Sequence, residues 1–267
     1  MFSDNFIKVL NKLKVTENLL SDTEKKNLDA KGFIILENYL STDLTKKILN
    51  NIEDIFEEEG PAAGIQKQNN SVNLDRYGQE EGVRRLCDLV NKGEIFKNIY
   101  LDKKLLSAVA YVLKRDFKLS SLNARDVLKG KGYQSLHADW KLNYDGNFHV
   151  FNSIWILDDF SEKNGSTRIV PSTHLRNPPK NLVPDYVHPE EQNIVVPKGS
   201  VIFMNAHLWH GGQENQTGQH RRAIHAYYTA YEHMQQTSQF EHLKYKTWLK
   251  LDESSKIILG IEENKII

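Results

Sequence analysis

Apolar residues near the start of the chain recur at helical spacing. Over residues 6–20 they return every three or four positions, which predicts an amphipathic helix. Ser21 or Asp22 can cap a second helix that carries Glu24 in its first turn. The N-terminal part of the chain is therefore predicted to form a helical layer.

The pattern then alternates between strand and helix. Residues 32–40 predict a strand, and Ser41-Thr42-Asp43 predicts the cap of a helix that extends to Ile55 and beyond. A polar segment rich in Gly and Asn follows over residues 59–82, and it is interpreted either as a cover over a binding site or as a surface loop. Apolar residues at helical spacing return over residues 95–113.

Beyond residue 117 the pattern changes to short apolar or alternating runs separated by Gly, Pro, Asn and Asp. Short strands at this spacing favour a sandwich or barrel over βαβ units. We therefore expect a mainly β core with flanking helices, all within one domain over residues 1–267. The predicted strands cover residues 119–123, 133–140, 149–157, 166–169, 193–196, 200–205 and 222–231.

Composition narrows the function classes. The formal net charge is +0, so nothing indicates a nucleic-acid partner. The single cysteine, Cys87, excludes an intramolecular disulfide and is interpreted as a small buried side chain. No apolar run reaches the roughly 20 residues that a membrane-spanning helix needs, and the first residues do not resemble a signal peptide. We expect a cytoplasmic protein without a membrane partner.

One short motif points to metal chemistry. On an extended strand, residues two positions apart face the same way, so His137 and Asp139 would present an imidazole and a carboxylate side by side. These are two of the three ligands of the 2-His-1-carboxylate triad that holds non-haem Fe(II). Because such a pair also arises by chance, a solvated strand remains the alternative.

A second motif supplies the missing ligand. His207 and His210 both follow a predicted strand, and we select His210 because two glycines after it would let backbone approach a small ligand closely. Eleven residues later stands Arg221, and the turn-rich connection predicts a hairpin that returns this arginine to the metal. A guanidinium there could bind the far carboxylate of a 2-oxo acid that chelates the iron.

The order and spacing of these motifs resemble the phytanoyl-CoA dioxygenase family of Fe(II)/2-oxoglutarate oxygenases. The resemblance extends from about residue 32 to residue 231 and is weak outside that range. The residues that carry it are Gln134-x-x-His137-x-Asp139-Trp140, Leu157-Asp158-Asp159, the run from Lys163 to His174, His210-Gly211-Gly212 and Arg221.

This resemblance implies a double-stranded β-helix, a cupin-like jelly roll over about residues 119–231, with residues 1–31 as an N-terminal helical extension. It implies that His137, Asp139 and His210 bind iron and that Arg221 binds 2-oxoglutarate. Two further residues, Gln134 and Trp155, match positions that line the co-substrate pocket in relatives. Strand alternation opposes Gln134, which stands three residues from His137 and needs a bulge to face the metal. For Trp155 a place in the core is the alternative.

The implied activity is hydroxylation of a C–H bond of a small molecule, with O2 and 2-oxoglutarate consumed and succinate and CO2 released. Because Asp139 is retained, halogenation is disfavoured. A cupin-like module that binds a metal or small ligand without turnover is the first alternative, and a zinc-dependent isomerase or hydrolase is the second. Arg221 at its fixed distance after His210 argues against both.

The sequence does not identify the substrate or the oligomeric state. Candidate pocket residues are Lys141, Asn143, Arg168 and the segment 77–85, whose cationic groups would suit a carboxylate or phosphate. The other histidines are expected to be hydrogen-bonded structural groups or to lie on the surface. The structural group comprises His149, His174, His207 and His225, and the surface group comprises His188, His220, His233 and His242.

Overall fold

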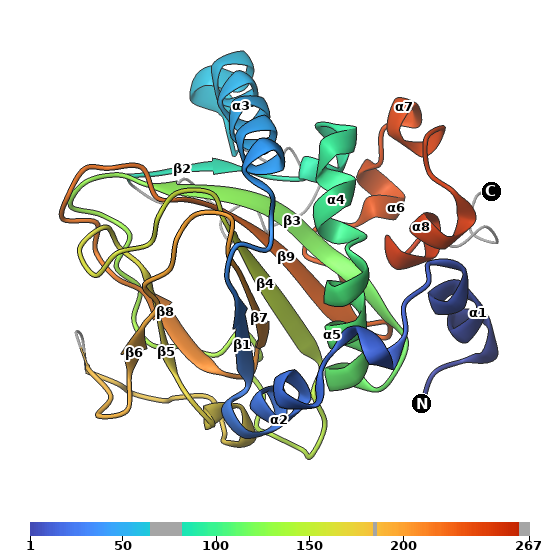
Figure 1. The fold of residues 1–267 in the computed structure, drawn as a ribbon, viewed down its shortest axis with the longest axis horizontal. Helices are drawn as coiled ribbons and strands as arrows, with labels where there is room; N and C mark the ends of the chain where they lie inside the picture. Colours follow the sequence, from blue (N-terminus) through green and yellow to red (C-terminus); the bar gives the residue numbers. More distant parts are fainter. Residues whose placement is uncertain (65–81, 184–185, 262–267) are drawn as a thin grey trace.

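A six-stranded antiparallel sheet forms the centre of the molecule (Figure 1). Its strand order is β1-β7-β4-β9-β3-β2. This is a computed structural model, and it describes residues 1–64, 82–183 and 186–261. The strands are β1 (Phe33–Leu36), β2 (Val83–Leu86), β3 (Phe117–Val127), β4 (Val150–Ile156), β7 (Val201–Asn205) and β9 (Arg222–Ala230).

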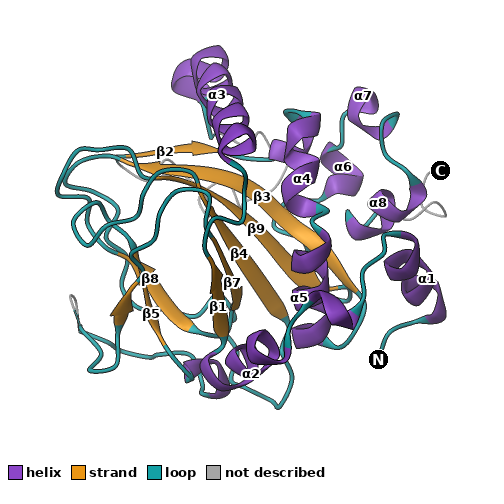
Figure 2. Ribbon diagram, in the orientation of Figure 1, coloured by secondary structure: helices purple, strands orange, loops and turns teal. Residues whose placement is uncertain are grey.

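A smaller antiparallel sheet faces one side of this large sheet, and helices cover the other side (Figure 2). The small sheet has the order β6-β5-β8, with β6 at Gln192–Asn193, β5 at Thr167–Val170 and β8 at Trp209–Gly212. Helices and strands occupy similar shares of the described chain, so the fold is mixed α/β rather than mainly β. Over the described ranges, no helix has the length and apolar character needed to cross a bilayer.

The helices at the N-terminus follow the predicted caps. Helices α1 (Asp4–Lys12) and α2 (Asp22–Lys31) precede β1, and Ser21 caps α2 by a reciprocal pair of hydrogen bonds with Glu24. Ser41 caps α3 (Thr42–Glu59) by accepting a hydrogen bond from the backbone N–H of Leu44. These local signals satisfy backbone donors that a helix start leaves without partners. The predicted caps of α2 and α3 are confirmed, whereas the helix predicted over residues 6–20 ends at Lys12, and Glu17–Leu19 forms a separate 3-10 helix.

Two helical regions differ from expectation. The predicted helix over 95–113 is divided into α4 (Lys97–Tyr100) and α5 (Lys103–Leu113), because Asp102 adopts an extended backbone and caps α5. Three short helices that the pattern did not predict follow β9: α6 (Gln239–His242), α7 (Tyr245–Trp248) and α8 (Glu253–Ile258). The segment expected to cover a site lies, from residue 65 to residue 81, outside the described residues.

Alternation along β4 separates two apolar cores. Phe151 and Trp155 belong to the core between the large sheet and the helices, whereas Ile154 and Ile156 belong to the core between the two sheets. Successive side chains of a strand point to opposite faces, which is why neighbours on β4 enter different cores. The large sheet is therefore buried on both faces, and polar groups between the sheets require a specific reason.

One predicted strand and one predicted hairpin are absent. Residues 133–140 form no regular strand, although an isolated pairing joins His137 to His210. β8 pairs with β5 in the small sheet, whereas β9 pairs with β3 and β4 in the large sheet. The chain between His210 and Arg221 therefore crosses from one sheet to the other, and the hairpin prediction was wrong.

Candidate metal centre

Three side chains converge between the two sheets with the spacing of metal ligands. Nε2 of His137 and Nε2 of His210 each lie 3.8 Å from Oδ1 of Asp139. The candidate ligand atoms of the three residues all lie within 4.8 Å of one another. Two imidazoles and one carboxylate on one side of an ion are the donor set of non-haem Fe(II), so the residues fit this metal.

Both imidazoles are oriented by backbone carbonyls. Nδ1 of His137 lies 2.9 Å from the carbonyl oxygen of Ser135, and Nδ1 of His210 lies 2.8 Å from that of Leu208. Each Nδ1–H can donate to its carbonyl, which fixes the tautomer that leaves the Nε2 lone pair for a metal. Burial, reinforced by the proximity of His210, lowers the pKa of His137 to about 4. His137 is therefore neutral at physiological pH, as a metal ligand must be.

The segment that carries His137 and Asp139 is held against β8 by backbone hydrogen bonds. His137 and His210 exchange N–H···O bonds of 2.9 and 2.8 Å, and the N–H of Asp139 donates to the carbonyl of Ala206 at 2.9 Å. A Cβ added at Gly211 would lie 2.6 Å from the carbonyl oxygen of Gln134. The chain's own backbone approaches this glycine, and Gly211 and Gly212 also line the cavity described below. The expected approach of a small ligand to this glycine pair stays a prediction.

Arg168 on β5 contacts the same segment through a hydrogen bond. This arginine is buried on β5, and its Nη2 donates to the carbonyl oxygen of Gln134 at 2.6 Å. Its Nη1 lies 3.3 Å from the carboxylate oxygens of Glu191. Arg168 was a candidate for substrate binding, but its hydrogen bonds support the metal-ligand segment. Lys141 donates to the carbonyl of Ala138, and Asn143 accepts from Lys180; neither lines the cavity described next.

The triad opens into a cavity of about 170 Å³ between the two sheets, and Arg221 lines the same cavity. Arg221 immediately precedes β9, and its N–H donates to Oδ1 of the buried Asp126 at 3.1 Å. Its guanidinium packs 4.7 Å from the ring centroid of Phe160, and its Nη2 lies 3.4 Å from Oγ1 of Thr167. Arg221 therefore lies in the cavity of the candidate metal centre, although the connection predicted to bring it there was wrong.

The two residues assigned to the co-substrate pocket have different positions. Gln134 lines the cavity, because the segment around it is irregular and strand alternation does not apply. Trp155 is fully buried on the opposite face of the large sheet, against Tyr39 and Phe203. The structure thus brings Gln134 to the site and keeps Trp155 in the core.

Sequence reasoning missed several residues of this cavity. Arg125 and Asn152 line it from β3 and β4, and His225 lines it from β9. Burial holds the pKa of His225 well below its usual value, and the positive charges of Arg125, Arg221 and Arg85 lower it further. The sequence did contain a signal for Arg125. Polar residues at alternating positions of a strand that is otherwise apolar indicate one face lined by polar groups.

Apart from His225, the other histidines of the sequence do not line the cavity of the triad. Nε2 of His207 accepts a hydrogen bond from the N–H of His149, and His174 reaches the carbonyl of Asp29. His149 also contacts His233 at 3.0 Å, and with Glu232 these two form a second group with metal-ligand spacing. Glu232, however, is already paired with Arg115, so the triad has the better claim to an ion.

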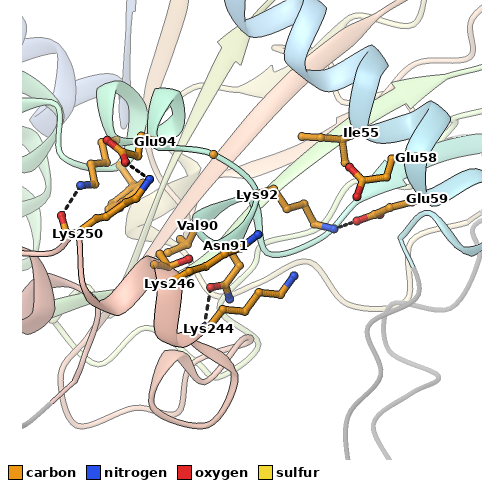
Figure 3. Close-up of a pocket in the computed structure, with 14 residues that line it drawn as sticks. Ile55, Glu58, Glu59, Val90, Asn91, Lys92, Glu94, Lys244, Lys246 and Lys250 are labelled. Carbon is orange, nitrogen blue, oxygen red and sulfur yellow. Dashed lines mark hydrogen bonds and ion pairs between the residues drawn. The ribbon is translucent and has the colours of Figure 1, made fainter.

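A second cavity, of about 250 Å³, lies between α3, the segment before α4, and α7 (Figure 3). It is lined by lysines and glutamates, among them the ion pairs Lys92–Glu59 and Lys250–Glu94. Burial and the nearby Lys244 lower the pKa of Lys92 to about 8. The described residues around it include no histidine, so it lacks the donors of a non-haem iron site.

Comparison with known proteins agrees with this geometry. The family model for phytanoyl-CoA dioxygenase (PhyH) matches residues 28–223. The chain is 28% identical over 214 residues to the dioxygenase trt7 of Aspergillus terreus, covering 74% of this chain and 69% of the relative. It is 27% identical over 191 residues to the dioxygenase FUM3 of Gibberella moniliformis, covering 65% and 62%.

Solved structures share the fold. HygX from Streptomyces hygroscopicus, with nickel and 2-oxoglutarate bound, superposes with a TM-score of 0.65 at 18% identity, covering 81% of this chain and 89% of HygX. EctD from S. alaskensis, with bound iron, gives a TM-score of 0.64 at 16% identity, covering 80% and 78%. The match over residues 28–223 establishes that the chain belongs to the phytanoyl-CoA dioxygenase (PhyH) family of Fe(II)/2-oxoglutarate dioxygenases.

Proposed function

We propose that this dioxygenase hydroxylates a C–H bond of a small molecule, with iron bound by His137, Asp139 and His210 and 2-oxoglutarate bound by Arg221. The observation that carries the proposal is that Arg221 and the triad line one cavity between the two sheets. We further propose that these two sheets are the halves of a double-stranded β-helix, which shelters its metal at one open end.

Iron, once bound, supplies the activation of O2 that side chains cannot perform. The protein supplies position and charge. Arg221 would present a planar fork to the far carboxylate of 2-oxoglutarate. Packing against Phe160 positions this guanidinium, and Asp126 accepts a hydrogen bond from the backbone N–H of Arg221. The hydroxyl of Thr167, 3.4 Å from Nη2 of Arg221, lies where it can share the same carboxylate.

Charge balance supports this assignment. Fe(II), the Asp139 carboxylate, doubly charged 2-oxoglutarate and Arg221 sum to zero, and a buried ionic cluster requires such compensation. A module that only binds metal would gain nothing from a buried arginine directed at the same cavity. For the substrate, the precedent is HygX, whose structure holds hygromycin B together with nickel and 2-oxoglutarate. We infer a small molecule here as well.

An anaerobic titration of the Fe(II)-loaded protein with 2-oxoglutarate tests the proposal. We expect the weak visible charge-transfer band of a chelated 2-oxo acid, and we expect it to disappear in Asp139→Ala and His210→Gln. His207→Gln is the matched control, because His207 lies three residues from His210 and bonds to His149 instead. Iron binding without this band would instead favour a binding module without turnover.

Succinate formation provides the second readout. Asp139→Ala should abolish it, since loss of the carboxylate leaves only two ligands for iron. Asp54→Ala, an exposed change on α3, should leave it at the wild-type level. Circular dichroism should show an unchanged fold for both variants. An active Asp139→Ala protein would refute the triad.

A further inference from the structure

A second group of metal-ligand side chains lies where β4 begins and β9 ends. It consists of His149, His233 and Glu232, whose candidate ligand atoms all lie within 4.8 Å of one another. Nδ1 of His149 lies 3.0 Å from Nε2 of His233. Two imidazole nitrogens bound to one tetrahedral zinc ion, each at about 2.0–2.1 Å, are roughly 3.3 Å apart. The two histidines are therefore already near the spacing that a metal ion requires.

The backbone fixes the relative positions of these two histidines. The carbonyl oxygen of His149 accepts a hydrogen bond of 2.8 Å from the N–H of Ala230, next to the register pair of Val150 with Thr229. The chain then turns, and the N–H of His233 donates to the carbonyl oxygen of Ala230 at 3.0 Å. This turn returns His233 to the strand end that carries His149. Such preorganisation lowers the entropy cost of binding.

Neighbouring side chains orient the ring of His149 in the manner of a metal ligand. Its Nε2 lies 3.3 Å from both carboxylate oxygens of Asp145. An Nε2–H that donates to Asp145 leaves the lone pair on Nδ1, the nitrogen that faces His233. Trp140 stacks on the buried ring, with the centroids 4.3 Å apart and the planes at 17°. A carboxylate behind an imidazole is the usual support of a metal-bound histidine.

Arg115 would compete with a metal ion for Glu232. Its Nη1 lies 3.0 Å from Oε1 of Glu232, and its Nη2 donates to Oδ1 of Asn147 at 2.9 Å. The Glu232 side chain is 52% exposed, and ion pairs in contact with water contribute little free energy. A carboxylate also offers two oxygens, so Arg115 on one oxygen leaves the other for a metal. The ion pair would thus weaken a metal site without abolishing it.

We propose that His149, His233 and Glu232 form a second site for a divalent transition-metal ion, separate from the iron triad. Two imidazoles and a carboxylate suit zinc, and water would complete a tetrahedral shell. The bound ion would join the chain just before β4 to the turn after β9. Trp140, which stacks on His149, directly follows Asp139, so the two sites are neighbours. They share no ligand, and the inference does not depend on the proposed function.

Zinc binding to the metal-free chain, measured by calorimetry and equilibrium dialysis, tests the site. We expect a zinc ion at each site of the wild type. An Asp139→Ala/His210→Gln chain, called the triad-deficient chain, keeps one triad ligand and should bind zinc at the second site alone. Adding His149→Gln or, separately, His233→Gln should abolish this binding. His233 is only partly buried, so its replacement tests the site even where loss of His149 disturbs the fold, which circular dichroism reports.

Two further variants of the triad-deficient chain test the supporting groups. Asp145→Asn should weaken zinc binding by roughly ten- to a hundredfold, the usual effect of losing a carboxylate behind a ligating histidine. Arg115→Gln should tighten zinc binding, because it releases Glu232 from its ion pair. His188→Gln is the control, since it removes a partly exposed imidazole outside this group and should leave zinc binding unchanged.

Two results would overturn the proposal. The first is a triad-deficient chain that binds no zinc. The second is zinc binding that persists in both His149→Gln and His233→Gln, or that His188→Gln lowers as strongly, because surface histidines would then hold the ion. The test involves neither 2-oxoglutarate nor turnover, so its failure would leave the proposed function untouched.

Discussion

Adjacent arginines at the start of β9 have separate environments. Arg221 faces the cavity, whereas Arg222 donates to Asp158 at 2.7 Å and to Glu53 at 2.9 Å on the other face of the sheet. The turn alone does not distinguish them, since both follow it, and the choice of Arg221 came from the family resemblance. The decision depends on which face of β9 meets the small sheet, and that is set by long-range pairing.

This difference predicts separable effects. Arg221→Gln should raise the dissociation constant of 2-oxoglutarate by roughly ten- to a hundredfold, the worth of a charge-assisted hydrogen bond. Iron affinity should change far less. Arg222→Gln is the matched control, and it should lower thermal stability with little effect on 2-oxoglutarate. Titration of both variants with each ligand provides the check, and equal losses in both would contradict the assignment of Arg221.

At the scale of elements, helix caps and strand positions were predictable because their signals are local. Ser21 with Glu24 and Ser41 are followed by helices, and the strand predicted over 149–157 is found as β4. The segment over residues 133–140, which carries His137 and Asp139, was wrongly predicted as a strand. Its conformation depends on contacts with β8 and with Arg168 rather than on the alternation of apolar and polar residues within it. The pairing of Arg85 on β2 with Arg125 on β3 was equally hidden, since register is a property of two strands.

The approach of backbone to β8 gives a second prediction. Gly211→Ala would place a Cβ 2.6 Å from the carbonyl oxygen of Gln134, so the segment carrying His137 must shift. We expect a loss of stability of about 1–3 kcal/mol, typical of overpacking, together with weaker iron binding. Gly93→Ala is the control, because its added Cβ would meet nothing closer than 3.5 Å. Unchanged iron affinity in Gly211→Ala would show that the segment tolerates displacement.

For the whole molecule, buried neutral histidines set the response to acid. Burial, with the nearby His149, lowers the pKa of His207 to about 3, and its Nε2 is occupied as an acceptor. In the unfolded chain the same group takes a proton below about pH 6.5. The unfolded state therefore binds more protons between these values, and stability falls as pH decreases from about 6.5 toward 3.

A thermal denaturation series from neutral to mildly acidic pH tests this dependence. The melting temperature of the metal-free protein should decrease with pH, and His207→Gln should make the decrease shallower, because glutamine keeps an acceptor but does not titrate. His188→Gln, on a partly exposed ring, serves as the control. An identical slope in His207→Gln and wild type would show that other groups govern the acid response.

The segment before Trp140 has a consequence for the motions of the protein. It carries two of the three candidate ligands, yet it is joined to β8 by an isolated pairing rather than by a continuous ladder. Such segments open locally at a lower free energy than central strands such as β4. A bound metal would add its binding free energy to closure of this segment alone. Hydrogen exchange should therefore slow at His137 and Asp139 when metal is added, and much less in β4. The closed state of this segment would then depend on the metal.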